Sequence, residues 1–229
     1  MFFLPTNSIE EPKIISKLPI CELAEIESLF HESLERLNIP CLYGYLFHDY
    51  TTFRKNIEAI EFLKSFNKAG KICKIGFSLY YPSQIEELIQ DKIPFDIVQI
   101  PYNIFDTRFQ QSFKLLKKHN VEIHVRSVFL QGLFFKDSNE LNNKLTKLKA
   151  PLIKLYNLAQ KKNISIMEIA LGFALLNNNI DKVIIGVDSL TQFEKNIQVF
   201  QRLDDVSKIM SELDELSINK EELVIPTHW

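Results

Sequence analysis

Short apolar runs alternate with longer amphipathic stretches along most of the chain. The runs are rich in β-branched and aromatic residues, as buried parallel strands are. They are Ile14–Leu18, Cys41–Phe47, Ile72–Phe77, Ile97–Ile100, Ile123–Val128 and Val183–Ile185. Between them apolar residues recur at spacings of three and four, for example over Leu23–Leu37 and Phe53–Phe66, which predicts helices. This alternation favours right-handed βαβ units and a parallel sheet.

The second half of the chain departs from the simple alternation. A longer excursion, Gln131–Ala150, follows the fifth run and is expected to lie over one end of the sheet. Helices are then predicted over Pro151–Lys162 and Ser165–Leu176, and after the last run over Leu190–Arg202 and Asp204–Leu216. Six strands are two short of the eight in a closed parallel barrel. An open doubly wound sheet would use six strands, but the chain has no Gly-rich phosphate motif.

The composition and charge of the chain indicate which kinds of partner it binds. A formal net charge of −2 without a long basic run gives no sign of nucleic-acid or membrane binding. Three cysteines, Cys21, Cys41 and Cys73, without a CxxC pair argue against a disulfide framework and a zinc or other metal site, and favour the reducing cytoplasm. The apolar start Met1–Leu4 lacks a basic flank, so we expect no signal peptide. Small molecules are the expected partners, with one domain as the default.

Four segments carry a family resemblance. Gly70–Ser78 and Phe95–Asp106 look like the middle of an aldo-keto reductase, Val125–Gly132 is similar to that family's cofactor loop, and Ile185–Asn196 to its adenosine-binding segment. The resemblance runs from about Lys13 to the C-terminus. It implies an α/β fold, a parallel (β/α) barrel of the TIM type that is incomplete, with about six of eight β/α units. Residues 1–229 would form a single domain that lacks the first two units.

The resemblance also implies a catalytic set. The family uses a Tyr as proton donor, a Lys paired with an Asp, and a His that orients the carbonyl, while a nicotinamide cofactor supplies hydride. Lys17 and His48 match the Lys and the His. The Asp and Tyr belong to a segment that would precede Lys17, and the residues before Lys17 contain neither type. We therefore expect a truncated chain whose carbonyl reduction is impaired.

Cofactor-binding residues follow from the same comparison. Gln99 is the family's partner for the nicotinamide amide, and Arg126 stands where many members place an aromatic residue that stacks on nicotinamide. Gln192 replaces an Arg that often grips the 2′-phosphate, so the cofactor is NADP or NAD without a stated preference. The full implied set is Ser78, Gln99, Arg126, Ser127, Phe129, Leu130, Gly132, Gly186, Val187, Asp188, Ser189, Gln192 and Asn196.

Plainer interpretations remain open for these residues. Lys17 fits a solvated rim position, His48 a loop histidine, and Ser189 a helix cap. Gln99 lies within an apolar strand, where an unpaired amide costs about 1–3 kcal/mol, so a neighbouring side chain is its alternative partner.

Three function classes compete. The first is an NAD(P)H-dependent oxidoreductase that reduces a small-molecule, sugar-like carbonyl substrate. The second is a catalytically inactive truncated relic or a nicotinamide-cofactor-binding module, and the third is an aldolase that forms a Schiff base through Lys17. The two missing strands would also leave open barrel edges, from which we expect self-association.

Overall fold

The structure is a computed structural model that describes residues 12–141 and 143–229. The chain divides into two compact units, Met1–Phe77 and Ser78–Trp229. The predictions made for the start of the chain, including Met1–Leu4, lie outside the described residues. No helix in the described part of the chain is both long enough and apolar enough to cross a bilayer.

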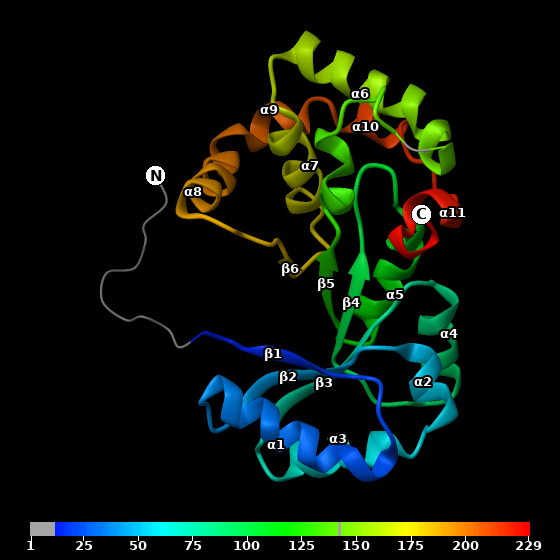
Figure 1. The fold of residues 1–229 in the computed structure, drawn as a ribbon, viewed down its shortest axis with the longest axis vertical. Coiled ribbons are helices and arrows are strands. Elements are labelled where there is room, and N and C mark those ends of the chain that lie inside the picture. The colour runs from blue at the N-terminus through cyan, green and yellow to red at the C-terminus, as the bar shows by residue number, and fades with distance from the viewer. Residues whose placement is uncertain (1–11, 142) are drawn as a thin grey trace. The chain divides into compact units, whose positions relative to one another are not determined.

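The first unit alternates strands and helices. Its elements are β1 (Ile15–Leu18), the 3-10 helix η1 (Leu23–Glu25), α1 (Ile26–Leu37), β2 (Leu42–Phe47), α2 (Tyr50–Lys55), α3 (Ala59–Lys68) and β3 (Ile72–Ser78). β2 pairs in parallel with β1 and with β3, and α1 and α3 lie along one face of these strands (Figure 1). The buried ring of Phe30 stacks on Phe66 with centroids 4.0 Å apart and meets Tyr45 of β2 edge-on at 5.2 Å. Aromatic packing therefore joins both helices to the sheet.

The second unit continues the alternation with more helices. It begins with α4 (Ser83–Gln90), β4 (Ile97–Pro101), η2 (Arg108–Ser112), α5 (Phe113–Lys118) and β5 (Glu122–Arg126), and then has η3 (Leu130–Phe135), η4 (Asn143–Leu148), α6 (Lys149–Lys162), α7 (Ile166–Leu175) and β6 (Lys182–Val183). The last elements are α8 (Leu190–Gln198), η5 (Val199–Arg202), α9 (Leu203–Ser207), α10 (Met210–Asp214), α11 (Glu221–Val224) and η6 (Pro226–His228). β5 pairs in parallel with β4 and with β6.

The core of the second unit lies between its strands and helices. The buried ring of Tyr102, just after β4, contacts Phe113 of α5 at 5.4 Å and Phe173 of α7 at 5.3 Å. By alternation Val98 and Ile100 share this side of β4, and both are fully buried. The residues that alternate with Val98 and Ile100 along β4 therefore face away from α5 and α7.

The predicted alternation and the parallel pairing are confirmed, whereas several element boundaries differ. The single helix predicted over Phe53–Phe66 is two helices, because Asn56 leaves the helical region with φ −127° and ψ 58°. β5 ends at Arg126, since Ser127 adopts φ 60°. β6 is only two residues long. The predicted excursion Gln131–Ala150 contains two short 3-10 helices.

Candidate functional site

Polar side chains line the side of β4 and β5 that faces away from the helices. Gln99 lies opposite His124, and Pro101 opposite Arg126, so Gln99 and Arg126 share this side on adjacent strands. His124 Nε2 lies 3.0 Å from a carboxylate oxygen of Glu122. Burial lowers the pKa of His124, against the opposing effect of Glu122. The balance favours a neutral, structural histidine.

Gln99 has an open amide. Its side chain is only 7% exposed, and among the residues that the structure describes none hydrogen bonds with this side-chain amide. Its amide atoms are not among the fully buried, unpartnered atoms of the described residues, so they remain accessible for bonding. The alternative interpretation, a bond to a neighbouring side chain, is not what the structure shows. Gln99 instead offers one donor group and one acceptor to a ligand.

The segment after β5 is held in an unusual backbone conformation. Ser127, Leu130, Gln131 and Gly132 have φ of 60°, 46°, 52° and 79°. Non-glycine residues in this region cost on the order of 1–3 kcal/mol each, and such strain gathers at ligand sites. Asn103 helps to hold the turn, because its Nδ2 donates to the Ser127 carbonyl at 3.1 Å.

The remaining side chains of this segment are fixed by local packing. The ring centroids of Phe129 and Phe135 lie 5.5 Å apart, and Leu130 is fully buried. Ser78, at the end of β3, is also buried. The implied cofactor loop is therefore an ordered turn in which the side chain of Leu130 is buried.

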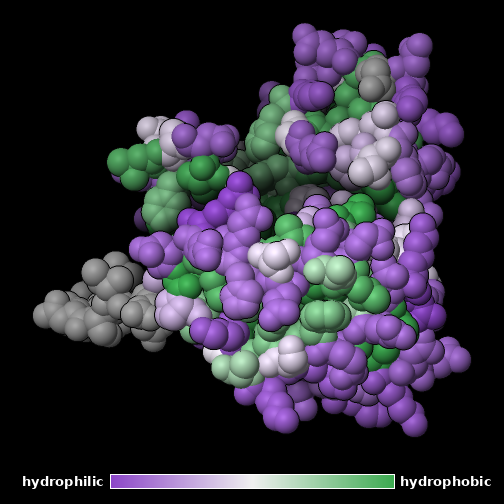
Figure 2. All heavy atoms as spheres, turned by 60° about the horizontal axis from the view of Figure 1, so that its bottom comes forward, coloured by the Kyte–Doolittle hydropathy of each residue, from purple (hydrophilic) through white to green (hydrophobic). Residues whose placement is uncertain are grey.

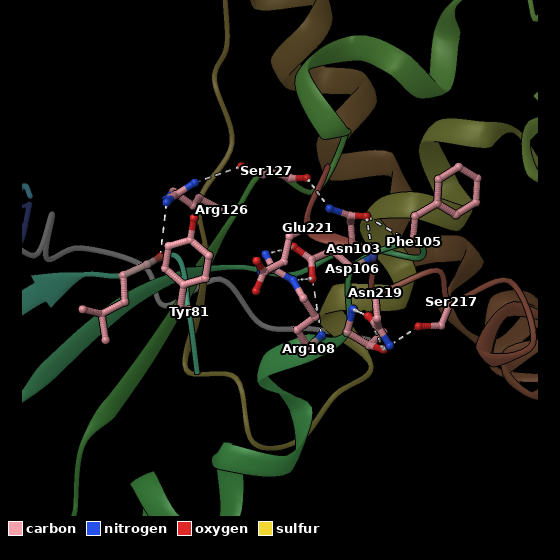
Figure 3. A network of polar contacts seen from close by, with 12 residues as sticks. Tyr81, Asn103, Phe105, Asp106, Arg108, Arg126, Ser127, Ser217, Asn219 and Glu221 are labelled. Atoms are coloured by element: carbon pink, nitrogen blue, oxygen red, sulfur yellow. Dashed lines mark hydrogen bonds and ion pairs between the residues drawn. The ribbon is translucent and has the colours of Figure 1, made fainter. Parts of the chain in front are cut away.

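A polar network supports this turn from below (Figure 3). The Asn103 Oδ1 accepts from the N–H groups of Phe105 at 3.0 Å and Asp106 at 3.1 Å. Asp106, which is fully buried, binds Arg108 through two hydrogen bonds of 2.8 and 2.9 Å, and Arg108 also lies 3.6 Å from Glu221. Sequence reasoning did not identify Arg108, although its position two residues after a buried acid was a usable signal.

The segment after β6 leads into the N-terminus of α8. Gly186 and Val187 are exposed, and the Asp188 N–H donates to Gln192 Oε1 at 2.7 Å. Ser189 Oγ accepts from the Gln192 N–H at 3.2 Å, which makes Ser189 the helix cap that the plainer interpretation expected.

Asn196 presents a second open amide. It is 4% exposed, and its Nδ2 has no hydrogen-bond acceptor in the described part of the chain. Together with the N–H groups at the start of α8, this donor suits a ligand that carries acceptor atoms and negative charge.

In the first unit the structure brings Lys17 and His48 together at the ends of adjacent strands. Lys17 lies opposite Leu46, and the His48 N–H donates to the Leu18 carbonyl at 3.1 Å. By alternation His48 lies on the same side of the sheet as Leu46 and Lys17. His48 also borders a small pocket lined by Leu18, Phe53 and other residues of this unit.

The strand tyrosines of this unit lie on the other side. Tyr45 pairs with Ser16, so it alternates away from Lys17, and its ring packs on Phe30 of α1. Burial raises the pKa of Tyr45 to about 12. Tyr43 shares the parity of Tyr45, and the ammonium groups of Lys13 and Lys74 lie over its ring at 5.0 and 5.5 Å. Alternation thus directs Tyr45 away from Lys17, and Tyr43 lies three positions before Leu46, the residue opposite Lys17.

The chain is similar to known proteins of one family. The sequence model described as the Aldo/keto reductase family matches residues 9–218. L-glyceraldehyde 3-phosphate reductase of Escherichia coli (strain K12) is 24% identical over 173 residues, which cover 65% of this chain and 50% of that protein. The uncharacterized oxidoreductase YqkF of Bacillus subtilis (strain 168) is 24% identical over 186 residues, which cover 76% of this chain and 60% of that protein. The chain thus spans about half the length of such relatives.

Solved structures show the same fold. The holo form of aldo-keto reductase AKR11C1 from Bacillus halodurans superposes with a TM-score of 0.72 at 21% identity, over 93% of this chain and 74% of that one. A thermostable aldo-keto reductase, Tm1743, in complex with the inhibitor epalrestat, gives a TM-score of 0.68 at 19% identity, over 92% of this chain and 73% of that one. The parallel strands and helices described above are therefore those of a (β/α) barrel with fewer units than its neighbours have.

Proposed function

Because the chain belongs to the aldo/keto reductase family, we propose that it binds a nicotinamide cofactor through its second unit. The observation that carries the proposal is the pair of mostly buried side chains at Gln99 and Asn196, of which the Asn196 Nδ2 is fully buried without an acceptor in the described part of the chain. Both belong to the implied cofactor set, and buried amides in native proteins are normally paired. A dinucleotide with a carboxamide at one end and acceptor atoms at the other supplies suitable partners.

Each part of the second unit has a proposed role toward this ligand. Gln99 would bond the carboxamide, with Ser78 and Arg126 beside the ring. The turn over Ser127–Gly132 would border the phosphates, with Phe129 and Leu130 as its apolar support. Gly186, Val187, Asp188 and Ser189 would lead to the start of α8, with Gln192 and Asn196 on the adenosine. We propose NADPH or NADH as the ligand. We propose no preference between them, since the neutral Gln192 supplies no positive charge for the 2′-phosphate that distinguishes NADPH.

The chemistry proposed for the family site is reduction of a small carbonyl compound, of a sugar-like class, to an alcohol. The cofactor supplies the hydride when it is bound. Lys17 and His48 would orient and polarise the carbonyl oxygen from one side of β1 and β2. We propose that the reaction is impaired in this 229-residue chain, because we expect no Tyr, Tyr80 and Tyr81 included, to take the donor position. Tyr43 and Tyr45 lie on the wrong side of the sheet, and the Tyr102 hydroxyl is bonded to Asn177 at 3.1 Å.

Two further parts of the proposal concern organisation and location. We propose that both units belong to one incomplete barrel domain, as the family match across both of them supports. A cytoplasmic location is supported by the three cysteines, all of which are free thiols.

Loss of either open amide should weaken cofactor binding. Gln99→Leu and Asn196→Leu each remove one hydrogen-bonding group, so we expect dissociation constants for NADPH and NADH to rise by roughly 2- to 10-fold, which corresponds to about 0.5–1.5 kcal/mol. Nicotinamide fluorescence during titration measures the change. Gln160→Leu, at an exposed position on α6, is the matched control and should bind as the parent does. Absence of binding by the parent chain would contradict the proposed function.

We also propose that the chain self-associates through an open edge of the second unit. β6 has a strand neighbour only on the β5 side among the described strands. Beside it, α8 and η5 expose an apolar stripe, defined as Leu190, Phe193, Ile197 and Phe200, with 47–71% of each side chain exposed. Exposed apolar side chains gather on α8 in Figure 2. Their spacing of three, four and three residues is that of a helix seam.

A charge within this apolar stripe should reduce self-association. We expect Phe193→Asp to lower the weight-average mass measured by light scattering at increasing protein concentration, because burial of a carboxylate in the contact is costly. Gln198→Asp introduces the same charge at an exposed position of α8 outside the stripe and should leave the mass unchanged. A parent chain that stays monomeric at all concentrations would show that this edge is not a contact.

A further inference from the structure

Arg126 presents its guanidinium group in a fixed position at the end of β5. The group lies over the ring of Tyr80, 4.3 Å from the ring centroid. Its NH2 donates to the Leu79 carbonyl at 3.4 Å, and its NH1 donates to Ser127 Oγ at 3.3 Å (Figure 3). The contacts to a ring, a carbonyl and a hydroxyl restrict both the place and the plane of the guanidinium.

No carboxylate within residues 12–141 and 143–229 lies within ion-pair distance of the Arg126 guanidinium. Arg108 in the same unit differs, because it is paired with Asp106 and Glu221. Burial lowers the pKa of Arg126, and the more distant Asp106 opposes this effect, but an arginine in a protein remains protonated. The site therefore holds a positive charge that no carboxylate of the described residues contacts.

The strand register places this charge beside the open amide. Gln99 and Arg126 lie on the same side of β4 and β5, and the residue opposite Arg126 is Pro101, two positions after Gln99. A flat ring whose carboxamide bonds to Gln99 would lie next to the guanidinium. Such a ring meets a fixed cation in a partly buried site, where solvent screening is weak.

Resting on the proposed function, we infer that Arg126 makes this site selective for the reduced form of the cofactor. The dihydronicotinamide ring of NADPH or NADH is neutral, whereas the oxidised ring carries a positive charge. Two like charges near contact distance repel strongly enough at a protein surface to change affinity by more than about tenfold. The rest of the dinucleotide is the same in both forms, so the ratio of the two dissociation constants isolates the effect of the ring.

The inference is tested by binding, without reference to turnover. Dissociation constants for NADPH, NADP⁺, NADH and NAD⁺ are measured by calorimetry for the parent chain, Arg126→Gln and Arg126→Lys. We expect the parent to bind the reduced forms at least about tenfold more tightly than the oxidised forms. Arg126→Gln should bring the ratio close to one, chiefly by strengthening the binding of the oxidised forms, whereas Arg126→Lys should keep most of the selectivity. Lys118→Gln, an exposed position on α5, removes the same charge elsewhere and should not alter the ratio.

The outcomes separate the inference from the proposed function. Equal affinity of the parent for both redox forms would overturn the inference and leave the proposed function standing. Binding of neither form would overturn both. A ratio that is unchanged in a folded Arg126→Gln variant would also overturn the inference.

Discussion

Reduction of an activated aldehyde by the purified 229-residue chain with NADPH is expected to stay near the uncatalysed background. A positioned general acid contributes roughly 10²–10⁴-fold to such a reaction. Lys17 and His48 share one side of the sheet, but the tyrosines of β2 lie on the other. The hydroxyl of Tyr102 is engaged by Asn177. We therefore expect no phenol to deliver the proton efficiently at Lys17.

The measurement is the loss of NADPH absorbance, compared between the parent chain, Lys17→Met and His48→Ala. We expect all three rates to be the same within error, since neither side chain acts on a carbonyl that receives no proton. Cofactor binding, measured in parallel, distinguishes a chain that binds the cofactor without turnover from a chain that does not bind it. Robust turnover that both substitutions abolish would show that the pocket has recruited a different acid.

Asp106→Ala is expected to lower the free energy of unfolding by about 3–5 kcal/mol. Asp106 is fully buried and makes two hydrogen bonds to the Arg108 guanidinium. Removal of the carboxylate leaves the buried arginine with Glu221, 3.6 Å away, as its one ionic partner among the described residues. Chemical denaturation followed by circular dichroism measures the change.

The matched control is a similar ion pair on the surface. Glu32 and Arg36 lie 3.4 Å apart on α1, with half or more of each side chain exposed. Glu32→Ala should therefore cost no more than about 1 kcal/mol. Equal effects of the two substitutions would mean that the buried network adds no more to stability than a solvated pair does.

Much of the fold could be predicted from the sequence because apolar periodicity is a local signal. The six apolar runs became six strands, and their parallel pairing followed from the helices between them. Boundaries were less predictable, since they depend on single backbone angles. Ser127 ends β5 with φ 60°, and a serine there gives no local sign of that conformation. Asn56 likewise divides one periodic stretch into α2 and α3.

The candidate site was predictable in residues but not in contacts. Motif resemblance identified Gln99, Arg126 and Asn196, whereas the placement of Tyr45 away from Lys17 required the observed strand register. The stack of Arg126 on Tyr80 joins residues 46 positions apart along the chain, which no periodic pattern reports. The link from Arg108 to Glu221 is longer still and depends on where the C-terminal segment returns.

The alternation along β4 also sets how the protein can change over generations. Val98 and Ile100 pack toward the helices, so substitutions there will be selected against as failures of folding, whatever the ligand. Gln99, between them, faces away from that core. A lineage that no longer needed the ligand should therefore lose Gln99 first while it keeps both flanking residues. The substitutions found along this strand in related sequences would therefore show whether ligand binding is still under selection or only the fold is.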